Sequence, residues 1–141
     1  MKKINMVDLN GQYRKIRWQV NREIKKVINT SSFVNGPIVK EFQNNLQEYL
    51  GVKHVIPCAN GTDALQIALM ALDLKIGDEV ITTNFSFAST IEVILLLGLK
   101  PVVIDIDPRT FNINPDLIQD KISNKTKAII PVHLFDQSCR M

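Results

Sequence analysis

Asn60, Gly61 and Thr62 form the strongest local candidate for a binding site in this sequence. They separate a short apolar run from a stretch rich in Ala and Leu, where a strand is expected to lead into a helix. The first amide groups of a helix have no partner within it, and the helix dipole favours an anion there. Glycine lets a ligand approach the backbone closely, and the threonine hydroxyl can donate another hydrogen bond. The segment indicates a phosphate site, or alternatively a plain N-cap followed by Asp63.

Two further loops follow expected strands and carry side chains that could contact a ligand. Phe85 and Phe87 come just after the apolar run that ends at Thr83. One ring could stack on a flat cofactor, whereas the other is expected to belong to the core. His133 follows the last apolar run, and a hydrogen-bonded structural role is the alternative to ligand binding there.

Metal, nucleic-acid and membrane binding are not predicted. Cys58 and Cys139 lie far apart and form no ligand cluster with a histidine. Asp105 and Asp107 could hold a cation, but the Pro-Arg-Thr that follows favours a surface turn. The net charge of +3 comes from basic residues interleaved with acidic ones, which argues against nucleic acid. No secretory signal or membrane span is recognised, so a reduced, cytoplasmic protein is expected.

The spacing of apolar residues divides the chain into an N-terminal helical segment, residues 1–50, and an α/β part, residues 51–141. Helical spacing predicts five helices, over residues 13–27, 39–50, 62–72, 89–97 and 115–122. Short apolar runs predict four strands, over residues 54–58, 79–83, 102–106 and 127–132. Alternating strands and helices predict a mainly parallel sheet with flanking helices. Ligands of such sheets bind at the carboxyl ends of the strands, where the candidate residues lie.

Taken together, these segments resemble the DegT/DnrJ/StrS type of sugar aminotransferase, which depends on pyridoxal 5'-phosphate (PLP). The matching stretches occur in the family's order and spacing at residues 33–37, 42, 59–65, 77–81, 85–90, 101–107 and 131–135. The resemblance implies the aspartate-aminotransferase-like fold, of which this α/β chain would be the N-terminal part of the large domain.

The resemblance also implies roles for individual residues. Gly61 and Thr62 match the residues that bind the PLP phosphate, and Phe87 matches the aromatic residue that stacks on the pyridine ring. Residues 35–37 (Asn35, Gly36 and Pro37) match a loop near the active site of the dimer. His133 matches the end of a strand beside the cofactor. Asp136 stands where the family commonly has glycine.

The function that the resemblance implies is transfer of an amino group, from glutamate, to a nucleotide-linked keto sugar for surface polysaccharide synthesis. A homodimer is implied as well. The lysine that binds PLP covalently and the aspartate that pairs with its pyridinium nitrogen match no residue here and are expected beyond Met141. The chain is therefore expected to be an N-terminal fragment that carries no catalytic residue and is inactive alone.

Three other interpretations stay open at this point. The chain could be a non-catalytic module that binds a phosphate ligand or docks as a pseudo-subunit, or it could be a non-functional gene remnant. It could also be an unrelated doubly wound nucleotide-binding protein. The sequence lacks the P-loop ending and the repeated glycines of a dinucleotide fingerprint, which argues against the nucleotide-binding interpretation.

Overall fold

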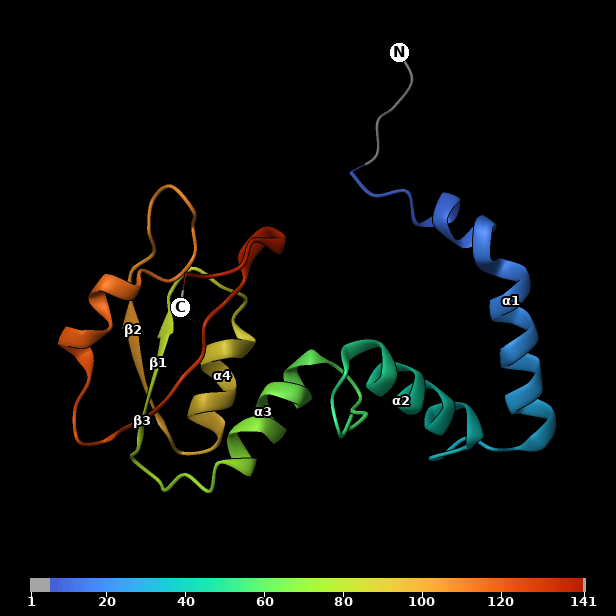
Figure 1. Cartoon of the computed structure of the whole chain (residues 1–141), viewed down its shortest axis with the longest axis horizontal. Helices are drawn as coiled ribbons and strands as arrows, with labels where there is room; N and C mark the ends of the chain where they lie inside the picture. The colour runs from blue at the N-terminus through green and yellow to red at the C-terminus, as the bar shows by residue number, and fades with distance from the viewer. Residues whose placement is uncertain (1–5, 141) are drawn as a thin grey trace, which may run out of the picture. The chain divides into compact units, whose positions relative to one another are not determined.

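The computed structural model describes residues 6–140, and these divide into two units between Pro57 and Cys58. Helices α1 and α2 belong to the first unit, and a small sheet with its helices forms the second (Figure 1). No helix within residues 6–140 is long and apolar enough to cross a membrane.

The two helices of the first unit begin and end at residues suited to those positions. Helix α1 (Leu9–Thr30) begins after Asp8, whose carboxylate accepts a hydrogen bond of 2.9 Å from the Gly11 amide. Helix α2 (Pro37–Leu50) has proline in its first turn and ends at Gly51, which is left-handed with φ 65°. Both predicted helices are confirmed, as is the glycine that ends the second.

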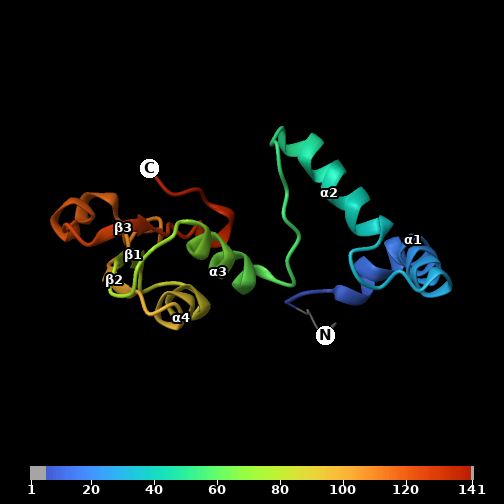
Figure 2. The ribbon, with the colours of Figure 1, turned by 90° about the horizontal axis from the view of Figure 1, so that it is seen from below.

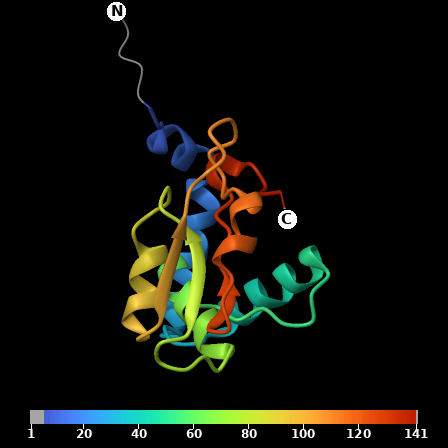
Figure 3. The same ribbon diagram turned by 90° about the vertical axis from the view of Figure 1, so that its left-hand side faces the viewer.

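The second unit contains a three-stranded parallel sheet in the order β2-β1-β3. The strands are β1 (Glu79–Thr83), β2 (Lys100–Ile104) and β3 (Thr126–Ile129), which Figure 3 shows side by side. Every residue of β1 is buried, because β1 pairs on both edges and is covered on both faces. The predicted parallel sheet is confirmed, with its central strand at the predicted residues.

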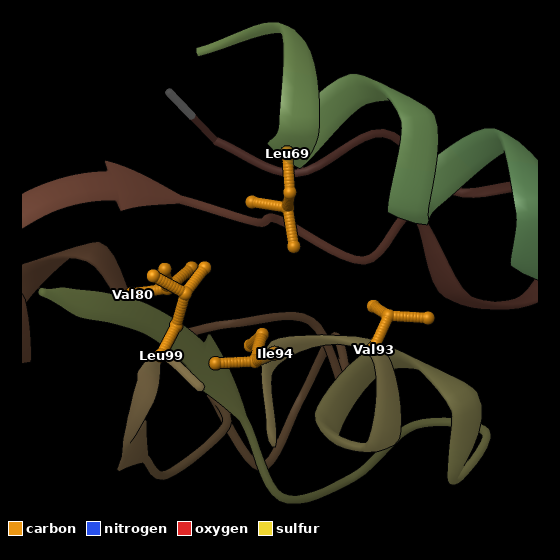
Figure 4. Close-up of a cluster of buried hydrophobic side chains, with 5 residues drawn as sticks. All are labelled: Leu69, Val80, Val93, Ile94 and Leu99. Carbon is orange, nitrogen blue, oxygen red and sulfur yellow. The ribbon is translucent and has the colours of Figure 1, made fainter. Parts of the chain in front are cut away.

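Apolar side chains pack against both faces of the sheet. Figure 2 shows α3 (Gly61–Ala71) and α4 (Ser89–Leu96) on one side of the strands, and the 3-10 turns η1 (Pro115–Leu117) and η2 (Gln119–Lys121) on the other. Successive residues of β1 alternate between the two sides. Val80 packs with the helices in a cluster that also contains Leu69, Val93, Ile94 and Leu99 (Figure 4). Ile81 packs on the opposite side with Ile104, Ile113 and Cys139.

Two predicted elements are wrong. Residues 54–58 form no strand, since no neighbouring strand pairs with them among the described residues and most of them are exposed. The helix predicted over residues 115–122 is replaced by η1 and η2. Asn114 and Pro115 start the turn as they would start a helix, but the amides of Ile118 and Lys121 then bond to the carbonyls three residues earlier, which is the 3-10 pattern. The helices predicted at 62–72 and 89–97 are confirmed as α3 and α4, whereas β2 and β3 end earlier than predicted.

Glu79 links the three strands at the amino edge of the sheet. This residue is 8% exposed, and its carboxylate accepts bonds of 2.7 Å from the Ser123 hydroxyl and 2.9 Å from the Lys100 ammonium. Lys100 begins β2, and Ser123 lies in the turn that leads into β3. The Ser123 hydroxyl, followed by Lys100, holds the pKa of Glu79 below its ordinary value of 4.5.

Replacing Glu79 with glutamine tests this contribution. A lowered folded-state pKa means that the carboxylate stabilises the fold above pH 4.5, and that this stabilisation is lost as the pH falls below 4.5. The urea midpoint of Glu79→Gln is therefore expected to lie below that of the wild type at neutral pH and to approach it in acid. Glu92→Gln, at an exposed position of α4, serves as the control. A difference from wild type that is equal at both pH values would contradict the assignment.

Candidate functional site

At the start of α3, two backbone amides donate no hydrogen bond to any residue between 6 and 140. Asn60 caps the helix, because its side-chain oxygen accepts a 3.0 Å bond from the Asp63 amide and its carbonyl a 3.1 Å bond from the Ala64 amide. The Gly61 and Thr62 amides have no acceptor among the residues that the structure describes. The N-cap and the phosphate site that the sequence left as alternatives are therefore compatible, since they use different amides.

Gly61 leaves open space around these donors. A Cβ atom built on Gly61 would have no neighbour within 4 Å, and its backbone lies outside the left-handed region. Glycine is thus not required here by packing or by backbone conformation. The free space and the two amides together fit a phosphate group, and the half-buried Thr62 can add its hydroxyl.

The loop after β1 presents an aromatic ring to solvent. Phe87 is 78% exposed and begins the turn into α4. Phe85 is 44% exposed and lies against Phe111 at a centroid distance of 5.8 Å. The expectation that one of the pair belongs to the core is wrong, because neither ring is buried. Phe87 is left available for stacking on a flat ligand.

His133 lies after β3, in a segment that continues beside β1. The Ile130 amide donates a 2.8 Å bond to the Ile81 carbonyl, and the Thr82 hydroxyl donates a 3.0 Å bond to the Ile130 carbonyl. The imidazole Nδ1 of His133 accepts a 3.0 Å bond from the Cys139 amide. The ring is thus hydrogen-bonded to backbone, as the structural alternative predicts, and it retains a second nitrogen for a ligand.

These groups belong to one edge of the sheet. Parallel strands end at the same edge, so the loops that carry Phe87 and His133 are neighbours by topology. Helix α3 precedes β1 and runs opposite to it, which directs its first residues towards that edge (Figure 1). This is the carboxyl edge, where open α/β sheets bind ligands.

Asn35, Gly36 and Pro37 lie in the first unit and are explained locally as the start of α2. Asn35 is left-handed with φ 47°, Gly36 is the N-cap, and Pro37 is the first helical residue. A Cβ atom on Gly36 would lie 2.5 Å from the Ser32 carbonyl oxygen, so only glycine fits.

Asp107 belongs to a surface turn that follows β2. Asp107 accepts a 2.8 Å bond from the Arg109 amide and forms a 3.2 Å ion pair with its guanidinium. The side chain of Arg109 is the main cause of a lowered pKa at Asp107. No group of three potential metal ligands occurs within the described part of the chain. The surface turn predicted from the sequence is confirmed.

The lysines of the second unit lie away from the candidate site. All five precede a strand or lie at its amino end, at positions 75, 100, 121, 125 and 127. Lys100 is engaged with Glu79, and Lys75 forms a 2.9 Å ion pair with Asp73. The carboxyl edge therefore has no lysine of its own within this unit.

Sequence reasoning missed Asn112, which holds the loop that follows His133. Its side chain is 3% exposed and bonds to two backbone groups of that loop. An isolated asparagine in a loop has no pattern that distinguishes it from a surface residue, so the sequence offered no signal for this role.

The second unit thus defines an open α/β domain whose carboxyl edge carries a helix start with two free amide donors, an exposed aromatic ring and a histidine. Residues 14–141 match the model of the DegT/DnrJ/EryC1/StrS aminotransferase family, and the chain belongs to this family. It is 46% identical over 134 residues to the UDP-2-acetamido-2-deoxy-3-oxo-D-glucuronate aminotransferase of Pseudomonas aeruginosa. That alignment covers 95% of this chain and 37% of the relative, so the chain spans little more than a third of the relative's length.

Solved structures share the fold of this chain. A DegT DnrJ EryC1 StrS aminotransferase from Brucella abortus matches with a TM-score of 0.91 at 40% identity, over 98% of this chain and 39% of that one. NtdA from Bacillus subtilis, solved with the bound cofactor PMP, matches with a TM-score of 0.84 at 37% identity, over 94% of this chain and 32% of that one. The family and the fold class predicted from the sequence are confirmed.

Alanine substitutions at Gly36 and Gly61 test the packing around these two glycines directly. Gly36→Ala is expected to lower the free energy of unfolding by about 1–3 kcal/mol, because the new methyl group would overlap the Ser32 carbonyl. Gly61→Ala, where the methyl group meets only open space, is the matched control and should leave stability unchanged or raised. Thermal unfolding followed by circular dichroism measures both. Equal stability of the two variants would contradict the close contact at Gly36.

Asp136 provides a second test of backbone conformation. It has φ 61°, in the left-handed region that favours glycine. Asp136→Gly is expected to raise the free energy of unfolding by about 0.5–1 kcal/mol, since the relieved strain exceeds the added chain entropy of glycine. Asp120→Gly, within a right-handed 3-10 turn, should instead destabilise the protein. The denaturant midpoints of both variants measure these changes in stability, and a loss of stability in Asp136→Gly would refute the prediction.

Proposed function

We propose that this chain supplies the phosphate-binding part of the active site of a PLP-dependent aminotransferase that acts on a nucleotide-linked keto sugar. The observation that carries the proposal is the start of α3. Gly61 and Thr62 present two unsatisfied amides beside open space at the carboxyl edge. A dianionic phosphate there would gain charge-assisted hydrogen bonds and favourable interaction with the helix dipole.

The remaining residues of the edge would orient the rest of the cofactor. Phe87 would stack on the pyridine ring, since its ring is exposed and lies in the loop next to α3 along the sheet. When bound, PLP supplies an electron sink and a carrier for the amino group. The protein's part at this edge is to bind the phosphate, to hold the ring flat and to exclude water from one face of it.

The substrate and the assembly are proposed from the family. The Pseudomonas relative acts on a UDP-linked 3-oxo sugar, and we assign this chain to the same class of nucleotide-linked keto sugars. Glutamate would be the amino donor, the working enzyme a homodimer, and its compartment the cytoplasm. The loop of residues 35–37 would contribute to the dimer's active site. No lysine of the second unit lies at the carboxyl edge, and the family resemblance implies that the covalent lysine would come from a later part of the enzyme.

Binding of pyridoxamine phosphate, PMP, tests the proposal. PMP has no aldehyde, so it cannot form imines with surface lysines, and calorimetry reports only non-covalent binding. Gly61→Ala is expected to weaken binding by about ten- to a hundredfold without loss of stability, because its methyl group would occupy the phosphate position. Thr62→Val, which removes one hydroxyl donor, should weaken binding about tenfold.

The control for this experiment is Thr30→Val, which removes a hydroxyl bonded to helix carbonyls in α1 of the first unit. Wild type and Thr30→Val should bind PMP equally. Failure of the wild type to bind PMP, or equal binding by Gly61→Ala and the wild type, would refute the assignment of the phosphate site.

A further inference from the structure

The loop that follows β3 is held in a strained conformation. Phe135 and Asp136 are adjacent non-glycine residues that both lie in the left-handed region, with φ 54° and φ 61°. Such residues persist only where the surrounding structure fixes them, and they concentrate at functional sites. Phe135 is also 77% exposed, so burial of its side chain does not account for the conformation.

The buried side chain of Asn112, which lies outside this loop, bonds to both ends of it. The Asn112 Oδ1 atom accepts a 2.9 Å bond from the Leu134 amide, and its Nδ2 donates a 2.9 Å bond to the Gln137 carbonyl. The two contacts lie on either side of the strained pair. Asn112 itself is 3% exposed and belongs to the loop after β2, so it joins two loops of the carboxyl edge. Both ends of its amide are satisfied, as a buried amide requires.

The closed loop fixes the imidazole of His133. Cys139 returns the chain to the core, where it packs with Ile81 and Ile113, and its Sγ donates to the Val132 carbonyl at 3.0 Å. Its amide donates to His133 Nδ1. A nitrogen that accepts a hydrogen bond carries no proton, so the proton of the neutral ring lies on Nε2. Nε2 has no partner within residues 6–140.

We propose that Asn112 is a positioning residue, which holds the 134–137 loop closed and thereby presents the Nε2–H of His133 as a donor to an acceptor oxygen of the bound ligand. This inference rests on the proposed function, because it assigns the ligand to the same carboxyl edge. The acceptor oxygen belongs either to the cofactor or to the nucleotide sugar, and two probes separate these sources.

The ring nitrogens of His133 report the positioning directly. Selective ¹⁵N labelling of histidine labels the two imidazole rings of this chain, those of His54 and His133. A His54→Gln variant shows which signals belong to His133. In the wild type, Nδ1 is expected to have the shift of an unprotonated acceptor and Nε2 that of a protonated nitrogen. In Asn112→Ala the two shifts are expected to converge, because the released loop lets both tautomers interconvert.

Two further variants serve as a matched control and as a second test of Asn112. Asn114→Ala removes an asparagine of the same loop that caps only η1, and its histidine shifts should equal those of the wild type. Asn112→Asp keeps an acceptor for Leu134 but loses the donor to Gln137, so it should give intermediate shifts even if Asn112→Ala unfolds. Wild-type shifts in both Asn112 variants would overturn the positioning role.

Ligand titration tests the donor role. A change in the Nε2–H signal on addition of PMP would assign the acceptor to the cofactor, and a change only with UDP-N-acetylglucosamine would assign it to the nucleotide sugar. A bound ligand that leaves the signal unchanged would overturn the donor role. If neither probe binds, the proposed function fails, whereas the histidine shifts without ligand still decide the role of Asn112.

Discussion

Pairing of β1 on both edges is the constraint on which the second unit depends. Its amides and carbonyls bond to β2 and β3, and its side chains alternate between two apolar clusters. Parallel pairing then requires all three strands to end at one edge. The loops that carry Phe87, Asn112 and His133 meet there for that reason, although they are far apart in the chain.

The chemistry of that edge comes from backbone groups as much as from side chains. The Gly61 and Thr62 amides have no acceptor within residues 6–140, because Asn60 accepts from the amides of Asp63 and Ala64. Gly61 keeps the approach to them open, whereas Gly36 is glycine because a carbonyl lies too close for any Cβ atom. Glycine is thus suited to these two positions for different physical reasons, and only the reason at Gly61 involves a ligand. The charged pair of Glu79 and Lys100 lies at the opposite edge, where it stabilises the sheet without contacting the site.

The sequence predicts best those parts of the fold that depend on residues close together in the chain. The alternation of strands and helices, the buried run of β1 and the glycine that ends α2 each follow from periodicity or from backbone preference. The strand expected over residues 54–58 failed because apolar content alone does not create a pairing partner. The segment 115–122 forms 3-10 turns in place of the expected α-helix, because the spacing of apolar residues does not distinguish these two kinds of helix over so few turns. Asn112 could not be recognised, since its importance comes from contacts with residues more than twenty positions away.

The amide resonances of Gly61 and Thr62 offer the most direct test of the central claim, that α3 begins at a phosphate-binding site. A ¹H–¹⁵N spectrum of the labelled chain would be recorded while PMP is added. The account predicts that these two amides shift most, because hydrogen bonds to phosphate form there, and that the Asp63 amide, already bonded to Asn60, shifts less. Binding of PMP with the largest shifts elsewhere, and none at Gly61 or Thr62, would contradict it.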